Sequence, residues 1–146
     1  LYFNSVGRNS KLLLNVPPTR VGLLHDVDVA RLAGFHERLQ TATLTGNSAD
    51  ARASFTPTGY RTAEAVVDLG HTVSASMVRL AENIANGQSV ARYTLYSATT
   101  GDWRILSRGG TIGYAKVDRF APTSMRRLRL VIEDAVAPLD PVTLLV

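Results

Sequence analysis

Residues 11–18 read Lys11-Leu12-Leu13-Leu14-Asn15-Val16-Pro17-Pro18, and this stretch decides how the first part of the 146-residue chain is interpreted. Four aliphatic residues within five positions predict a strand at residues 12–16 that is buried on both faces, as in a parallel sheet covered by helices. The two prolines fix φ and lack N–H donors, so pairing must end there. A strand of this kind cannot be covered by its own neighbours in sequence. We therefore expect residues 1–40 to pack against protein outside their own local sequence.

A helix is predicted at residues 26–40, where apolar side chains recur at the 3.6-residue spacing of one helix face. Asp26 or Asp28 can cap its amino terminus. A buried strand, a loop and an amphipathic helix together form half of a βαβ unit. The helical spacing stops near residues 40–44, so we place a domain boundary between residues 41 and 42. The expected apolar side of the helix consists of Val29, Leu32, Phe35, His36 and Leu39.

Beyond the boundary, residues 42–146 change to a period of two. Turns rich in Gly, Asn and Asp separate short alternating segments, which is typical of an antiparallel β-sandwich or jelly roll. The predicted fold class is therefore mainly β, preceded by one strand-helix unit. Strands are expected at residues 42–45, 63–69, 74–80, 90–96, 103–107, 114–120, 127–132 and 142–146.

Alternation within these segments also predicts which side chains face the core. Side chains two positions apart in a strand share a face, and a register error of one residue would exchange the two faces. The expected core set is Leu95, Ile105, Val117, Leu128, Leu130 and Ile132, and the expected outward set is Arg92, Arg104, Arg127 and Arg129.

Two collinear parts of the sequence resemble α-L-fucosidases of glycoside hydrolase family 29. The first part comprises residues 2–10, 12–18, 22–23 and 28–32, and resembles the last βα unit of the family's catalytic barrel. The second comprises residues 87–95, 101–104, 110–114 and 119–120, and resembles the family's carboxy-terminal sandwich. The resemblance thus implies that residues 1–41 belong to a (β/α) barrel and residues 42–146 form a galactose-binding-like sandwich. Residues 47–61 depart from the family pattern, because the loop is short, lacks Trp and has one acidic residue.

The resemblance implies an exo-acting, retaining enzyme that releases fucose from glycans. A retaining glycosidase needs two carboxylates about 5–5.5 Å apart. In the family both come from earlier barrel strands, so no residue of this chain is predicted to be catalytic and the chain alone is expected to be inactive. Asn15, at the carboxyl end of the expected barrel strand, is a substrate-side candidate, because barrel active sites lie at that end. Its alternative role is to hold the Pro17-Pro18 turn.

Exposed aromatic rings are the candidates for sugar binding, since a sugar's apolar face stacks on an aromatic face. Trp103, Tyr60 and Tyr96 are the candidates here. Two other functions therefore stay open: a non-catalytic carbohydrate-binding module, or a structural or interaction sandwich. Under the favoured reading the partners are the rest of the barrel and a fucosylated glycan. Residues 1–40 could alternatively be covered by a second copy in a homo-oligomer, or by the outer face of the sandwich.

Composition removes several other classes. The net charge of +4 and the pI near 9.9 come from dispersed arginines without a nucleic-acid-binding motif, so no nucleic-acid partner is expected. His25, His36 and His71 lack ligand spacing, so neither a metal nor another cofactor is expected. The sequence has no Cys and no stretch as long as a membrane span, and we expect no signal-peptide pattern before the first predicted strand. The resemblance favours a soluble periplasmic or secreted protein.

Overall fold

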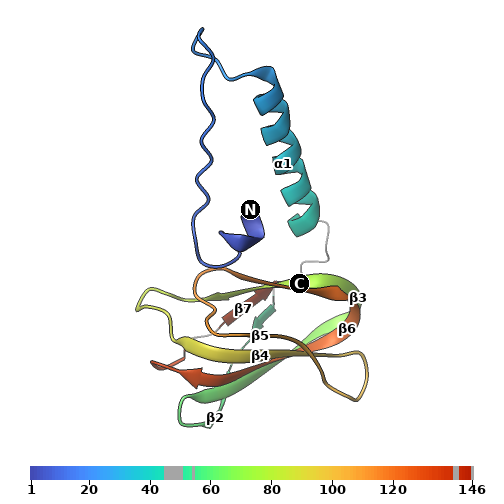
Figure 1. Cartoon of the computed structure of the whole chain (residues 1–146). Helices are drawn as coiled ribbons and strands as arrows, with labels where there is room; N and C mark the ends of the chain where they lie inside the picture. Colours follow the sequence, from blue (N-terminus) through green and yellow to red (C-terminus); the bar gives the residue numbers. More distant parts are fainter. Residues whose placement is uncertain (45–50, 54, 140–141, 146) are drawn as a thin grey trace.

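The computed structural model describes residues 1–44, 51–53, 55–139 and 142–145, and for residues 42–44, 51–53 and 142–145 it describes the backbone only. A β-sandwich forms the base. An extended segment, residues 11–24, which we call the arm, and one helix rise from it (Figure 1). The elements are η1 Tyr2–Asn4, α1 Asp26–Leu44, β1 Ala51–Ala53, β2 Thr56–Gly59, β3 Thr62–Glu82, β4 Val90–Ala98, β5 Arg104–Gly109, β6 Lys116–Ala135 and β7 Val142–Leu145.

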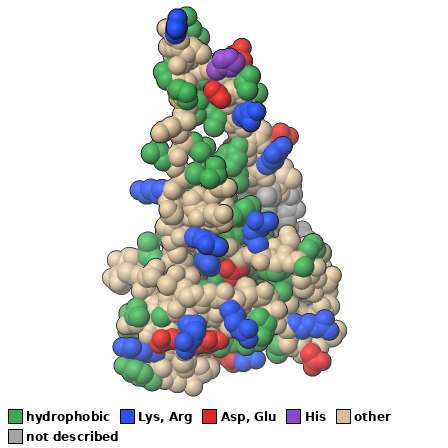
Figure 2. Space-filling model, in the orientation of Figure 1, with side chains coloured by type: hydrophobic (Ala, Val, Ile, Leu, Met, Phe, Trp, Pro, Cys, Tyr) green, Lys and Arg blue, Asp and Glu red, His purple; other side chains and the backbone are tan. Residues whose placement is uncertain are grey.

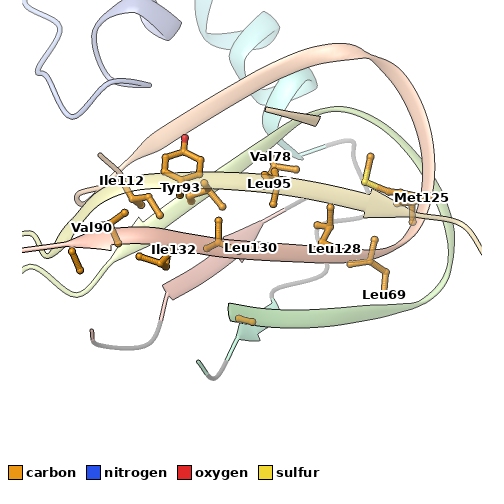
Figure 3. Packing of buried hydrophobic residues seen from close by; sticks show 14 residues of the cluster. Leu69, Val78, Val90, Tyr93, Leu95, Ile112, Met125, Leu128, Leu130 and Ile132 are labelled. Atoms are coloured by element: carbon orange, nitrogen blue, oxygen red, sulfur yellow. The ribbon is translucent and has the colours of Figure 1, made fainter. Parts of the chain in front are cut away.

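All strand pairs in the described residues are antiparallel, in the order β1-β7-β3-β6-β4-β5, with β2 paired to β3. The long strands β3 and β6 pair along most of their length and bend at irregularities in their ladder, so the sheet folds over a core. Buried side chains from both layers fill the space between them (Figure 3). The mainly-β, antiparallel prediction is confirmed.

Two pairs of predicted strands are in fact single long strands. Residues 63–69 and 74–80 both lie in β3. Residues 116–120 of the predicted strand 114–120 lie in β6 together with residues 127–132, whereas residues 114 and 115 precede the strand. The expected turn at Gly70 and His71 is a bulge, where Gly70 has φ +79° and donates its amide to Asp68 Oδ1 at 2.8 Å. The strand predicted at 42–45 is wrong at residues 42–44, which continue α1, and residue 45 lies outside the described residues.

The core confirms most of the expected register. Leu95, Leu128, Leu130 and Ile132 are fully buried, whereas Arg92 and Arg104 are exposed. Arg127 and Arg129 are half-buried by aromatic neighbours on the outer face.

Two core predictions are wrong, and both errors lie beside irregular pairing. Ile105 is 48% exposed, because the β4–β5 ladder skips a residue and places Ile105 opposite Tyr96 while Leu106 packs on the core. Val117 is only half-buried, since it pairs with exposed Arg79, and its neighbour Asp118 takes the inward position.

In residues 1–41 the structure differs from the strand predicted at residues 12–16. Residues 11–17 are extended but form no strand, since the described residues place no neighbouring strand beside them. The predicted helix is confirmed and runs four residues further, to Leu44. Its first turn is capped by His25 rather than an Asp, because Val27 donates its amide to His25 Nδ1 at 3.2 Å. Val29 and His36, expected on the apolar side, are exposed.

Candidate functional site

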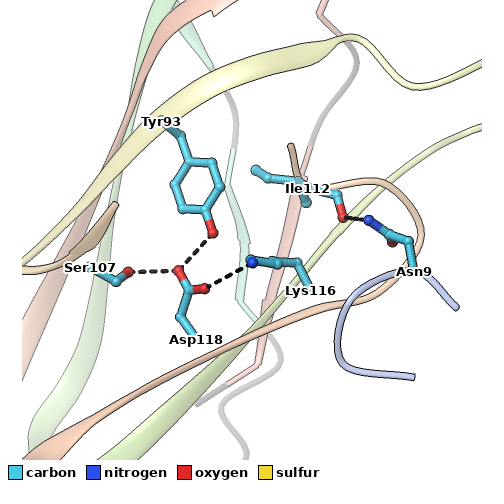
Figure 4. A network of polar contacts seen from close by, with 6 residues as sticks. All are labelled: Asn9, Tyr93, Ser107, Ile112, Lys116 and Asp118. Carbon is cyan, nitrogen blue, oxygen red and sulfur yellow. Dashed lines mark hydrogen bonds and ion pairs between the residues drawn. The ribbon is translucent and has the colours of Figure 1, made fainter. Parts of the chain in front are cut away.

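Asn9 joins the start of the chain to the sandwich. Its backbone has φ +63°, a left-handed conformation that Asn tolerates better than most residues. Its side-chain amide donates to Ile112 O at 2.7 Å (Figure 4). Its Oδ1 accepts a hydrogen bond from the Ala115 amide at 2.8 Å. The Asn9 amide also donates to Ala115 O at 3.0 Å. Residues more than 100 positions apart are thus held by three hydrogen bonds.

The contacts continue on both sides of Asn9. Gly7 is buried, and its carbonyl accepts the Val117 amide at 2.9 Å. A Cβ at Gly7 would lie 2.9 Å from Phe3 O and 3.2 Å from Val117 Cβ, so the close approach requires glycine. The Arg119 guanidinium lies 4.8 Å from the centre of the Phe3 ring. Residues 1–10 therefore pack on the sandwich, and we call this contact the junction.

Glu82 supports the junction from below. Its carboxylate accepts three backbone amides, from Ser89 at 2.8 Å, Val90 at 3.0 Å and Gly113 at 2.7 Å. Its own amide donates to Gly113 O at 2.7 Å. One nearly buried carboxylate therefore fixes two loops, including the loop that receives Asn9. Sequence reasoning missed this residue.

A second buried polar cluster lies behind the same loop. Asp118 Oδ2 accepts hydrogen bonds from the Tyr93 hydroxyl at 2.7 Å and the Ser107 hydroxyl at 2.6 Å (Figure 4). Lys116 Nζ lies 3.8 Å from Oδ1. Burial, and then the adjacent Asp118 carboxylate, raises the pKa of Tyr93, so the hydroxyl stays protonated and donates. Through these hydrogen bonds Asp118, in β6, is linked to Tyr93 of β4 and Ser107 of β5.

Above the junction, the arm exposes apolar side chains. Residues 18–24 form a small closed turn, in which Pro18 bridges Leu24 and Thr19 donates its amide to Leu23 O at 2.7 Å. Green side chains line the arm and the adjoining face of α1 (Figure 2). The predicted site residue Asn15 is exposed on this arm. The exposed apolar side chains are Leu13, Leu14, Val21, Leu23, Leu24, Val27 and Val29.

The three predicted stacking residues lie in two places. Arg129 brings Trp103 and Tyr96 together, since its guanidinium carbon is 6.0 Å from the centre of the Trp103 ring and 5.7 Å from that of Tyr96. Arg127 lies 5.2 Å from the same Trp103 ring. Tyr60 is separate, at the turn between β2 and β3, and is 86% exposed. Sugar binding by these rings stays a prediction.

Among the residues that the structure describes, no three His, Asp or Glu side chains converge as metal ligands would. No helix in this described part of the chain combines the length and apolarity needed to cross a bilayer.

No model of a protein family matches the chain. Known proteins do match it. A rice protein (Oryza sativa subsp. japonica) named for α-L-fucosidase activity is 30% identical over 168 residues, which cover 97% of this chain and 32% of the rice protein. The crystal structure of a Bacteroides ovatus protein named for the same activity is 33% identical with a TM-score of 0.82, covering 99% of this chain and 24% of its own.

A Ruminococcus gnavus family-29 fucosidase, solved in complex with fucose, matches at 26% identity and a TM-score of 0.76 over 99% of this chain and 34% of its own. The chain is related to the α-L-fucosidases of glycoside hydrolase family 29. The similarity lies with the carboxy-terminal domains of these family-29 proteins. The chain spans about a third of the length of its curated relatives.

Proposed function

We propose that this chain is the carboxy-terminal part of an exo-acting, retaining α-L-fucosidase, and that its sandwich supports the catalytic barrel. The observation that carries the proposal is the exposed apolar arm of residues 11–24. It occurs in a chain that matches only about a quarter to a third of the length of its fucosidase relatives. In this proposal the arm and α1 are the last βα unit of the barrel. The substrate of the whole enzyme is a fucosylated glycan, which fits a periplasmic or secreted location.

The junction explains how a sandwich supports a barrel. Hydrogen bonds at Asn9 and Gly7 fix the start of the arm, so the orientation of the arm follows from the sandwich. Leu13 is 85% exposed, and covering a side chain of this size contributes roughly 1.5–3 kcal/mol. Several such side chains along one arm favour an extensive protein cover.

Several carboxylates of the sandwich are engaged in structural contacts. Glu82 and Asp118 hold backbone amides and hydroxyls, and Glu133 pairs with Arg92 at 3.0 Å. Retaining hydrolysis needs a free pair of carboxylates about 5–5.5 Å apart. As the resemblance to the family implies, we assign both catalytic groups to the barrel outside this chain.

Hydrolysis of an aryl α-L-fucoside tests the proposal. The purified chain, with its mass verified to exclude longer enzyme, should show no turnover, whereas adding the barrel polypeptide should restore it. Leu23→Asp on the arm should prevent restoration, and Val66→Asp, on the exposed outer face of β3, should not. Turnover by the mass-verified chain alone would refute the proposal.

A carbohydrate-binding module is the second candidate, favoured by the exposed Tyr60 ring. A purely structural sandwich, or exchange of the arm between two copies, would instead leave the chain without affinity for either a glycan or a barrel. Sedimentation of the chain alone and with barrel polypeptide separates these outcomes.

A further inference from the structure

An open cleft lies at the turn between β2 and β3. Its volume is about 400 Å³, in the range of small-molecule sites. In Figure 1, β2 lies at the end of the sandwich opposite α1 and η1. The cleft, at the turn between β2 and β3, is therefore at the end of the sandwich away from the arm. The side chains that give it its character are Phe55, Tyr60, Arg61, Val136, Pro138 and Leu139.

Tyr60 and Arg61 form the tip of the cleft. The Arg61 guanidinium carbon lies 5.2 Å from the centre of the Tyr60 ring, which orients the ring while leaving 86% of the residue exposed. Arg61 has φ +61°, a backbone conformation that favours Gly or Asn. A long basic side chain therefore stands at a turn position where a smaller residue would be easier to accommodate.

Hydroxyl groups complete the polar side of this turn. Thr62, which lines the cleft beside Arg61, accepts at Oγ1 a hydrogen bond from Thr58 Oγ1 at 3.1 Å. An exposed aromatic face, a guanidinium with several donors and a hydroxyl are groups that recognise a pyranose ring, which has an apolar C–H face and a rim of hydroxyls.

We propose that this cleft binds a terminal sugar residue of a glycan. The C–H face of the sugar stacks on Tyr60, and Arg61 donates hydrogen bonds to its hydroxyls. The volume lies in the range of sites for small molecules, a class that includes single sugars. The proposal deepens the second candidate function given above, a carbohydrate-binding module, and rests on it; it does not depend on hydrolysis.

The other predicted stacking site is less suited to a sugar. Arg127 and Arg129 both lie against the Trp103 ring, and Arg129 also lies against Tyr96. A sugar would have to displace these guanidinium groups, and Arg129 is held by Glu64 at 2.8 Å. At Tyr60 a single guanidinium, that of Arg61, lies 5.2 Å from the ring centre, and a sugar stacks beside it or on the opposite face of the ring.

The position of the cleft gives the binding a use. Because the cleft lies at the end of the sandwich away from the arm, a glycan held there leaves the arm and α1 free to contact a barrel. The sandwich would then hold the enzyme on glycan-bearing surfaces while a different sugar residue is processed elsewhere.

Titration of the complete 146-residue chain with immobilised glycans and with free L-fucose and D-galactose tests the proposal. We expect saturable binding, which Tyr60→Ala weakens by about tenfold because it removes the stacking face. Arg61→Gly should weaken binding while preserving the fold, since Gly suits φ +61°. Trp103→Ala is the matched aromatic control and should leave binding unchanged.

Three results would overturn the proposal. They are no saturable binding at millimolar sugar, binding that Trp103→Ala abolishes and Tyr60→Ala does not, and dimerisation in sedimentation that Tyr60→Ala removes. The last would make the cleft a contact between copies. Loss of aryl-fucoside turnover is not among the readouts, so failure here is distinguishable from failure of the proposed fucosidase role.

Discussion

At the scale of single residues, the link between the arm and the sandwich depends on Asn9. Replacing it by glycine keeps the left-handed backbone but removes the two side-chain hydrogen bonds to Ile112 and Ala115. We expect Asn9→Gly to lower the free energy of unfolding by about 1–3 kcal/mol, because two backbone groups lose their partners. Urea unfolding measures this. Asn15→Gly, at an exposed position, is the control, and an equal loss there would remove Asn9's special role.

Glu82 is the second residue whose chemistry is specific. A glutamine has the same shape, but one of its two terminal atoms becomes a donor that faces a backbone amide. We expect Glu82→Gln to cost about 2–4 kcal/mol, since charged hydrogen bonds are lost and a donor is left facing a donor. The control is Glu64→Gln, which removes one partner of the half-buried ion pair between Glu64 and Arg129. Thermal unfolding compares the melting temperatures of the two variants. Similar melting temperatures for the two variants would count against this role.

Glu133 makes the free energy of unfolding depend on pH in the acidic range. A hydrogen bond from Thr94, and then Arg92, lowers its pKa below the ordinary 4.5. A lowered folded-state pKa gives stability that is present above 4.5 and is lost as the pH falls through the folded-state value. Glu133→Gln should therefore flatten the acid side of the stability–pH curve. Asp134→Asn, at the exposed neighbouring position, serves as control, and an unchanged acid slope in Glu133→Gln would contradict the assignment.

At the scale of elements, β6 carries the centre of the core. Leu130 is fully buried and pairs with Ala65 on one side and Leu95 on the other. Leu130→Ala should cost roughly 2–5 kcal/mol, because it removes buried methyl groups and leaves a cavity. Val66→Ala, 53% exposed on β3, should change stability little. Chemical denaturation of both variants tests the register, and reversed costs would mean that β3 and β6 are shifted by one residue.

The strands also show what a sequence can and cannot predict. Alternation correctly placed Leu128 and Leu130 in the core, because regular pairing keeps a period of two. It failed at Val117, where irregular pairing and hydrogen bonds from Tyr93 and Ser107 turn Asp118 inward instead. Gly70 was read as a turn because glycine suits a bulge and a turn equally.

The candidate site was less predictable than the fold. Asn9 and Glu82 act on backbone groups, and Asn9's partners lie more than 100 positions away, so composition and spacing carry no trace of them. The aromatic candidates could be found from residue type alone. Which ring is free could not, because that depends on Arg127 and Arg129 reaching Trp103 from a different strand.

At the scale of the whole molecule, the arm is the feature that a sandwich alone leaves unexplained. It is fixed at the junction, rises from the sandwich beside α1 and exposes aliphatic side chains along its length (Figures 1 and 2). Covering such apolar side chains with another protein surface lowers the free energy, because it removes them from water. The relatives that match this chain are about three times its length, which provides such a surface in the proposed enzyme.

Hydrogen–deuterium exchange of residues 11–24 tests this central claim most directly. The measurement compares the chain alone with the same residues in the complete enzyme, and residues 62–82 of β3 serve as the internal reference. The account predicts rapid exchange of the arm in the chain alone, because residues 11–17 lack strand partners, and strong protection in the complete enzyme. Equal exchange of the arm in both samples, with β3 protected in each, would contradict it.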